Sequence, residues 1–156
     1  MTSAASTIEL RTFSELGPVR GDVVDVYAEV RAPLLHLLNY AVTAFGKRLD
    51  GHGAEPGFTL VLAYTDGHPV GYAYGNRIEH GDRYWQRTTP EPAQDYTQHP
   101  IVALKEIGVR DAWRGTGTAR RMHDAFLATR DEPYVPCLCG QSSEIYIVIC
   151  FGWYHR

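Results

Sequence analysis

The sequence predicts one domain of the mixed α/β (α+β) class, with a central sheet flanked by helices. The chain has 156 residues, a length that fits a single domain. Its apolar residues occur both in runs of strand length and in stripes of helical spacing. These patterns follow in the order strand, two helices, hairpin, strand and helix, which indicates helices packed on one sheet. We therefore expect residues 1–156 to form one domain, with residues 1–6 flexible.

The first third of the chain predicts a strand and two helices. Residues 7–13 carry Ile8 and Leu10 on one face, as a short strand does. A first helix is predicted by apolar residues at the spacing i, i+3, i+4 and i+7, namely Val23, Val26, Tyr27 and Val30. It should end before Pro33, because the residue before a proline avoids the α region. A second helix is predicted by an apolar stripe that ends in basic residues and glycine: Leu34, Leu38, Ala41, Phe45, Leu49, with Lys47, Arg48 and Gly51.

The following segment predicts a hairpin, a long loop, a strand and a helix. Residues 58–64 and 70–78 have strand character and are joined by Asp66-Gly67, a strong hairpin signal. Gly71 and Gly75 indicate a bulge or a close backbone approach in the second of these strands. Residues 79–100 are expected to form a long loop and residues 101–109 a further strand. Residues 116–130 are expected to form a helix whose inward positions are Ala119, Met122 and Phe126.

Composition excludes several classes of partner. The net charge is −3 and the isoelectric point is near 6.1, so no general attraction to nucleic acid is expected. No apolar run approaches the ~18 residues of a membrane span, and residues 1–6 lack the apolar stretch of a signal peptide. We expect a cytoplasmic protein with no membrane partner. Cys137 and Cys139 are separated by one residue, whereas structural zinc pairs have two to four between them, so no metal site is expected.

The stretch from Glu106 to Ala119 carries the chemistry that the sequence reveals. A strand ends near Val109, a loop contains Gly115 and Gly117, and a helix begins at once. The first N–H groups of a helix have no internal acceptor, and the helix dipole adds positive potential there. Glycines let the backbone bring these groups close to a phosphate, and Arg114 adds a charge-assisted hydrogen bond. The stretch therefore predicts a site for a pyrophosphate-bearing ligand.

Two common phosphate-binding motifs do not fit this loop. A nucleotide P-loop needs Lys followed by Ser or Thr after the second glycine, and Thr118-Ala119 occupies that place. A dinucleotide fingerprint needs a third small residue where Arg120 stands. An ordinary glycine-rich turn without a ligand is the remaining alternative.

The run Arg114-Gly115-Thr116-Gly117-Thr118-Ala119 resembles the cofactor-binding motif of the GNAT superfamily of N-acetyltransferases. The resemblance covers about 25 residues, and the order of elements from residue 7 to residue 130 agrees with that fold. It implies a GNAT-like mixed sheet and acetyl-CoA as co-substrate. The backbone of Ile107, Gly108 and Val109 would then pair with the pantetheine arm, and residues 114–119 would hold the pyrophosphate.

The resemblance also implies catalytic roles. The reaction is attack of an amine on the thioester, and Glu106 is the candidate that takes the proton, directly or through water. Because Ile107 and Val109 share one strand face, Glu106 and Gly108 should share the other. A structural ion pair is the alternative role for Glu106. Tyr146 and Tyr154 are candidates for protonating the leaving thiolate.

The last 26 residues depart from the family pattern. Pro133 and Pro136 interrupt the place of the expected helix, and the apolar run 145–151 resembles a strand. Gly152-Trp153 resembles the family's glycine–aromatic pair, but the sequence stops three residues later. We therefore expect an atypical short C-terminus, and a homodimer if a sheet edge is left open.

The function that the sequence favours is an N-acetyltransferase acting on a primary amine, in a small molecule rather than a protein. Two alternatives stay open. One is a non-catalytic acyl-CoA-binding or sensing domain with a degenerate acceptor site. The other is a transferase of longer acyl chains, or one acting on hydroxyl groups.

Overall fold

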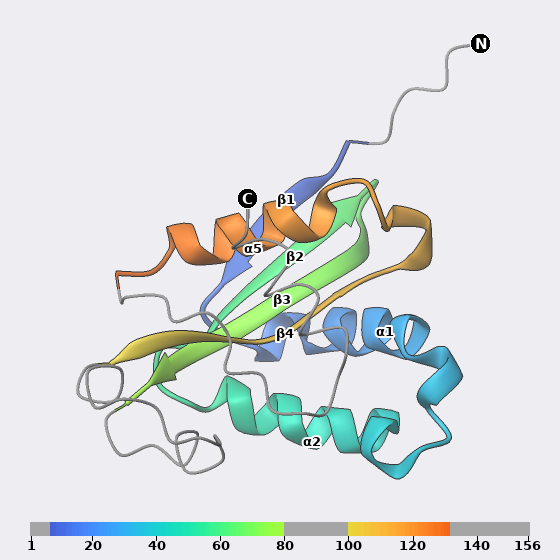
Figure 1. The fold of residues 1–156 in the computed structure, drawn as a ribbon, viewed down its shortest axis with the longest axis horizontal. Helices are drawn as coiled ribbons and strands as arrows, with labels where there is room; N and C mark the ends of the chain where they lie inside the picture. Colours follow the sequence, from blue (N-terminus) through green and yellow to red (C-terminus); the bar gives the residue numbers. More distant parts are fainter. Residues whose placement is uncertain (1–6, 80–99, 132–156) are drawn as a thin grey trace, which may run out of the picture.

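The computed structural model describes residues 7–79 and 100–131 (Figure 1). Four strands form one antiparallel sheet in the order β1-β2-β3-β4: Glu9–Phe13, Thr59–Thr65, His68–Ile78 and Ile101–Val109. Three α-helices accompany them: α1 (Arg20–Val30), α2 (Val42–Gly53) and α5 (Thr118–Ala128). The α/β class predicted from the sequence is confirmed. A mixed sheet also needs a parallel pair, and none occurs among the four described strands.

The β2–β3 hairpin forms at the predicted dipeptide. Its two-residue turn places Asp66 at φ 48° and Gly67 at φ 78°. Both angles are left-handed, as the turn type that matches the twist of paired strands requires. The hairpin sets β2 and β3 at the centre of the sheet, with β1 against β2 and β4 against β3.

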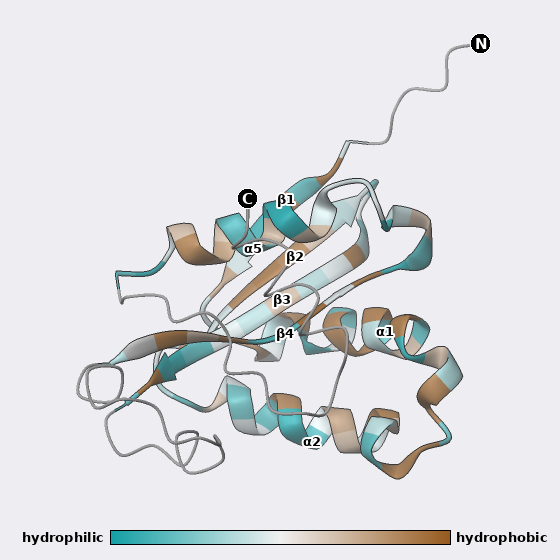
Figure 2. Ribbon diagram, viewed as in Figure 1, coloured by the Kyte–Doolittle hydropathy of each residue, from teal (hydrophilic) through white to brown (hydrophobic). Residues whose placement is uncertain are grey.

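The helices form two layers, one on each face of the sheet (Figure 1). α1 and α2 cover one face, where Val23, Phe45 and Leu49 pack with Leu60 and Leu62 of β2. α5 covers the other face of the sheet. There its side chains Met122 and Phe126 pack against residues of β2, β3 and β4, namely Val61, Ala73, Ile107 and Val109. In Figure 2 hydrophobic residues run along β2, while hydrophilic residues mark outward positions of α5. The inward positions predicted for α5 are thus confirmed.

A β-bulge in β4 determines which way the later residues of that strand point. Tyr74 pairs with Glu106 but Gly75 pairs with Leu104, so Lys105 is the extra residue. The bulge exchanges the two faces. Val102 and Leu104 pack toward α5 before it, and Ile107 and Val109 do so after it. Gly75 allows the close approach, because a Cβ there would lie 2.1 Å from the carbonyl oxygen of Ala103. Of the two features that the sequence indicated in β3, the close approach occurs at Gly75, and the bulge lies opposite it in β4.

The second predicted helix begins later than expected. Residues 32–34 and 38–40 form separate 3₁₀ turns, and Ala41 has extended backbone with ψ 143°. Leu38, assigned to the apolar stripe, is 86% exposed. Two backbone carbonyl groups that a continuous helix would use accept hydrogen bonds from side chains instead. The Tyr27 hydroxyl donates to Tyr40 O, and the Arg48 guanidinium donates to Asn39 O. The helix then continues to Gly53 rather than stopping at Gly51.

The remaining boundaries differ by a few residues. α1 ends at Val30, before Pro33 as expected, and β4 spans 101–109 as expected. α5 runs over 118–128, shorter than the predicted 116–130. Within the described ranges the longest helix has 12 residues, and none is long and apolar enough to cross a membrane. Most of the loop predicted over residues 79–100, both candidate tyrosines (Tyr146 and Tyr154) and the C-terminal segment lie outside the described residues.

Candidate active site

The connection from β4 to α5 has the backbone geometry of an anion site. After Val109 a 3₁₀ turn spans Asp111–Trp113, and α5 then begins at Thr118. Gly115 and Gly117 have φ angles of 73° and 83°, which residues with a side chain rarely adopt. Apart from the adjacent residues, no atom of the described segments lies within 4 Å of the Cβ position of either glycine. The glycines thus turn the backbone sharply and leave open space beside it.

The first turn of α5 presents unpaired donors to that space. Arg121 is the first residue whose N–H bonds back along the helix, to Gly117 O at 3.0 Å. The N–H groups of Thr118, Ala119 and Arg120 therefore have no acceptor within the helix. Gly117 provides no side-chain cap. These three donors and the helix dipole favour an oxygen-rich anion.

A cavity of about 470 Å³ lies against this turn. Its walls come from the end of α1, the end of β4 and the β4–α5 connection: Val30, Arg31, Ile107, Gly108, Val109, Trp113, Arg114, Gly115, Gly117, Thr118, Ala119 and Arg120. The volume falls within the range of about 300–1,000 Å³ usual for ligand sites. Eight of the nine residues expected to bind the co-substrate line this one cavity.

Thr116 is the ninth of those residues, and it does not line the cavity. Its hydroxyl donates to Trp113 O at 2.5 Å and lies 2.8 Å from the hydroxyl of Thr118. The side chain therefore holds the loop in shape from behind the glycines. Arg114 forms an ion pair with Asp111 at 3.1 Å while its side chain remains half exposed.

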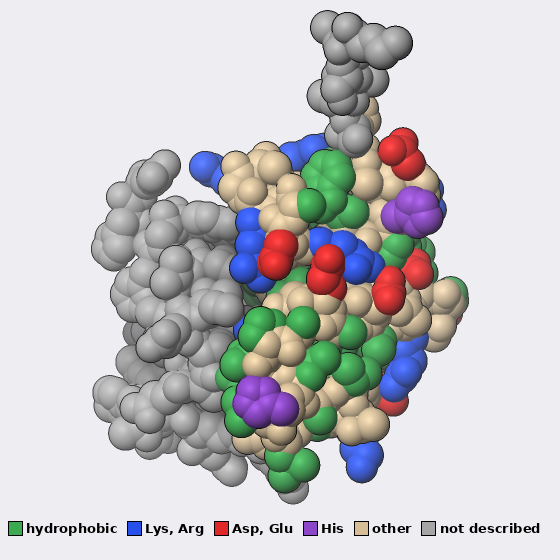
Figure 3. Space-filling model, turned by 90° about the vertical axis from the view of Figure 1, so that its right-hand side faces the viewer, with side chains coloured by type: hydrophobic (Ala, Val, Ile, Leu, Met, Phe, Trp, Pro, Cys, Tyr) green, Lys and Arg blue, Asp and Glu red, His purple; other side chains and the backbone are tan. Residues whose placement is uncertain are grey.

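The sequence did not reveal Val30, Arg31 or Trp113 as cavity residues. Trp113 lies inside the stretch from Glu106 to Ala119, and its place in that stretch was the available sequence signal. Val30 and Arg31 lie about 80 residues away in the sequence, and only the packing of α1 brings them to β4. Val23, Val26 and Tyr27 of α1 are fully buried in that packing, and Arg110 adds ion pairs at its edge with Asp25 at 2.7 Å and Glu29 at 3.1 Å. Figure 3 shows acidic and basic side chains side by side on the face toward this end of the molecule.

Glu106 lies on the opposite face of β4 from Ile107 and Val109, as expected. It is 7% exposed and accepts hydrogen bonds from Tyr72 at 3.1 Å and Tyr74 at 3.2 Å. Burial raises the pKa of its carboxyl group, while Arg48, Arg31 and the two tyrosines pull that pKa down. Burial also raises the pKa of both tyrosines well above the usual value, so each remains a donor at neutral pH.

Glu106 does not itself line the cavity, but it adjoins residues that do. Its strand neighbour Ile107 is a lining residue, and Gly108 is another. A Cβ at Gly108 would lie 2.9 Å from the ring of Tyr72, so this glycine leaves room for the tyrosine that bonds Glu106. The carboxylate is thus fixed one residue away from the wall of the cavity.

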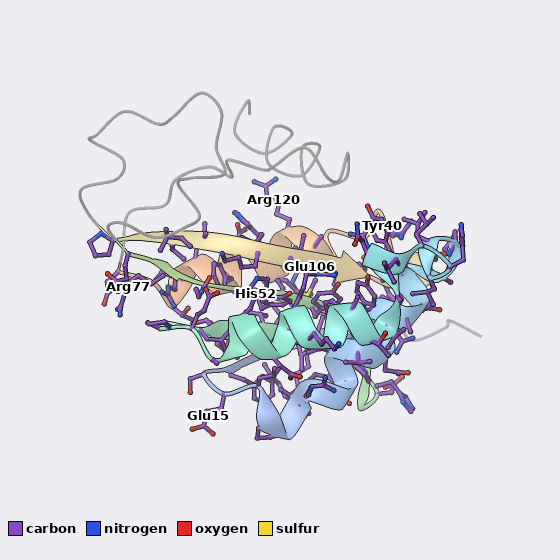
Figure 4. All side chains as sticks on the ribbon, turned by 90° about the horizontal axis from the view of Figure 1, so that it is seen from below. Glu15, Tyr40, His52, Arg77, Glu106 and Arg120 are labelled. Atoms are coloured by element: carbon purple, nitrogen blue, oxygen red, sulfur yellow. The ribbon has the colours of Figure 1, made fainter. Side chains whose placement is uncertain are left out.

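His52 of α2 extends the hydrogen-bond network. Its Nδ1 lies 3.2 Å from the hydroxyl of Tyr74, and Figure 4 shows His52 and Glu106 between α2 and β4. Burial lowers the pKa of His52, with a further reduction from the charge of Lys105. The imidazole is therefore neutral at neutral pH. Because Tyr74 donates to Glu106, Nδ1 of His52 must carry the hydrogen that joins it to Tyr74.

The described segments contain no group of three or more potential metal ligands. The three cysteines all lie outside those segments.

A four-stranded antiparallel sheet with two helices on one face and a glycine-turn helix on the other is the fold of the GNAT acetyltransferases. Solved structures agree over most of the chain. Aminoglycoside N-acetyltransferase AAC(6')-Iy in complex with CoA superposes with a TM-score of 0.61 at 13% identity, covering 99% of this chain and 90% of that one. The aminoglycoside acetyltransferase meta-AAC0020 from an uncultured soil metagenomic sample, in complex with sisomicin, gives 0.59 at 12% identity, covering 96% and 87%.

A GNAT family acetyltransferase from Brucella melitensis in complex with acetyl-CoA gives a TM-score of 0.54 at 16% identity, covering 80% of this chain and 69% of that one. No protein-family model matches the sequence, and no curated protein matches it either. At these identities the likeness establishes the fold.

Proposed function

We propose that this protein is an N-acetyltransferase that moves an acetyl group from acetyl-CoA to the primary amine of a small molecule. The observation that carries the proposal is that two features meet at one cavity. A glycine turn with three helix N–H groups that have no acceptor within the helix lines the cavity, and the strand that forms part of its wall carries the buried carboxylate of Glu106. The proposal retains the single domain, the cytoplasmic location and the possible homodimer expected from the sequence.

The residues present fit acetyl-CoA. The N–H groups of residues 118–120 and the guanidinium of Arg114 would hold the pyrophosphate. Residues 107–109, which line the cavity, would lie along the pantetheine arm. When bound, acetyl-CoA supplies the activated acetyl carbonyl, and its thiol is the leaving group.

Glu106 would act as the general base. An amine is protonated at neutral pH and must lose a proton before it can attack. A carboxyl group whose pKa is raised by burial is a better proton acceptor than an exposed one, and because Glu106 does not line the cavity, the proton would pass through a water molecule. Tyr72 and Tyr74 would hold the carboxylate in one orientation. Tyr146 stays a candidate for protonating the thiolate.

Turnover tests this function. We expect the purified protein to release CoA thiol from acetyl-CoA in the presence of an amine acceptor, with a rate that rises with pH as Glu106 loses its proton. Glu106→Gln should lower kcat about 10²–10⁴-fold and remove that rise. Calorimetry should show acetyl-CoA binding unchanged in the variant, because Glu106 does not line the cavity. An unchanged pH–rate profile would exclude Glu106 as the base, and binding without turnover of any amine would favour the sensing domain.

A further inference from the structure

Arg31 is a buried cation in the wall of the cavity. It directly follows the last residue of α1, is 5% exposed, and is a lining residue. Its Nε is buried and has no hydrogen-bond acceptor among the described residues. No carboxylate in that part of the chain lies within ion-pair distance of it. Its guanidinium carbon lies 5.8 Å from the centroid of the Tyr40 ring, a cation–π contact.

A guanidinium in this state indicates a ligand of opposite charge. Burying a charge without pairing it is costly, and arginine does not lose its proton to avoid that cost. The planar fork of donors matches a carboxylate in a two-point contact. A carboxylate entering the cavity would satisfy Nε and neutralise the charge together.

The position of Arg31 separates two possible anions. The pyrophosphate has its own donors at the start of α5, together with Arg114. Arg31 instead directly follows α1, which packs on the sheet face that carries Tyr72 and Tyr74, the two tyrosines that bond Glu106. Arg31 therefore lies on the side of the cavity near the proposed base, where the acceptor amine must arrive, and its charge lowers the pKa of the Glu106 carboxyl group.

We propose that the acceptor is an amino acid, and that Arg31 binds its carboxylate while its amine faces Glu106. This inference rests on the proposed function and specifies its substrate class. The ammonium gives one proton to Glu106, and the nitrogen lone pair then forms the C–N bond as the C–S bond breaks. The second proton of the nitrogen leaves to the thiolate, so the products are an N-acetyl amino acid, CoA thiol and one proton.

The charge of the described cavity wall agrees with this substrate class. It contains Arg31, Arg114 and Arg120 and no acidic side chain among the described residues. A polyamine such as an aminoglycoside would meet three positive charges there, whereas an amino acid contributes a carboxylate. The acceptor is thus inferred to differ from those of the aminoglycoside acetyltransferases that share the fold.

The test compares each amino acid with its own carboxamide, which keeps the amine and loses the negative charge. CoA release is measured for the twenty amino acids and their amides with wild type, Arg31→Gln and Arg31→Lys. Arg121→Gln serves as the control, since Arg121 is the next arginine on α5 but does not line the cavity. Calorimetry with acetyl-CoA and thermal melting accompany each variant.

We expect wild type to prefer at least one acid over its amide by about tenfold to a hundredfold in kcat/KM, the range of a charge-assisted hydrogen bond. Arg31→Gln should remove that preference with acetyl-CoA affinity unchanged, Arg31→Lys should restore part of it, and Arg121→Gln should keep it. Equal use of acids and amides by wild type would overturn the inference while leaving the acetyltransferase intact. So would an Arg31→Gln variant that loses rate equally on both, or that binds acetyl-CoA more weakly. Failure of wild type to bind acetyl-CoA would overturn the proposed function itself.

Discussion

At the scale of single residues, the site depends on a carboxylate kept where water does not solvate it. Glu106 owes its environment to Tyr72, Tyr74 and the helices that cover them. The strand face of Glu106 followed from the sequence, because residues 106–109 alternate regularly. The hydrogen-bond partners of Glu106 could not be predicted from the sequence. Core packing explained Tyr72 and Tyr74 as well as a functional role did, and no local pattern marked His52. Only the pairing of β3 with β4 and the position of α2 bring these groups together.

The raised pKa of Glu106 has a consequence for stability. A group whose pKa is higher in the folded state stabilises the fold below its unfolded pKa, here about 4.5, and that contribution is lost as pH rises through the folded value. The free energy of unfolding of wild type, relative to Glu106→Gln, should therefore fall between pH 4.5 and pH 8. Urea titrations of both proteins across this range measure it. A difference that grows with pH would mean that Glu106 is stabilised as an ion.

The two tyrosines that bond Glu106 should shift its titration. Each hydroxyl lowers the pKa of the carboxyl group, so Tyr72→Phe and Tyr74→Phe should each move the rising limb of the pH–rate profile to higher pH. Tyr64→Phe is the control, because its hydroxyl bonds Asp22 at 2.7 Å and does not touch Glu106. A shift to lower pH, or an equal shift in the control, would contradict this assignment.

At the scale of elements, the hairpin, the β4 strand and the start of α5 could be predicted because each has a local signal. The dipeptide Asp66-Gly67 fixes the turn, and the glycines at 115 and 117 fix the β4–α5 connection. The start of α2 could not be predicted, because the apolar spacing continued through residues 34–41 where side chains bind the backbone carbonyls. The approach of α1 to the cavity could not be predicted either, since it depends on packing between α1 and strands far away in the sequence.

The bulge in β4 gives a direct test of this packing. Gly75→Ala would place a Cβ 2.1 Å from Ala103 O, against a backbone atom that cannot rotate away. We expect a loss of more than about 2 kcal/mol in the free energy of unfolding, as for overpacked cores. Gly21→Ala in α1 is the control, since its Cβ meets nothing within 4 Å and it should add up to about 1 kcal/mol. Chemical denaturation compares them, and an unchanged Gly75→Ala variant would contradict the close approach.

At the scale of the whole molecule, two helical layers and one sheet bring together residues from opposite ends of the described chain. α1 supplies Val30 and Arg31, β4 supplies the strand wall, and α5 supplies the anion donors. The general fold is shared with aminoglycoside and other GNAT acetyltransferases. The buried Arg31 could not be predicted from the sequence motif, because the motif covers only the residues at the co-substrate end of the cavity.

The most direct test of the account is calorimetric titration with acetyl-CoA of wild type, Gly117→Asp and Gly67→Asp. Both glycines have a positive φ and nothing within 4 Å, and aspartate tolerates this backbone better than most residues. Both variants should therefore fold, but only the carboxylate at position 117 would repel a pyrophosphate at the start of α5. We predict binding by wild type and Gly67→Asp, and at least about tenfold weaker binding by Gly117→Asp, equivalent to about 1.4 kcal/mol. Equal affinity in all three proteins, or no binding by folded wild type, would contradict the claim that this turn holds acetyl-CoA.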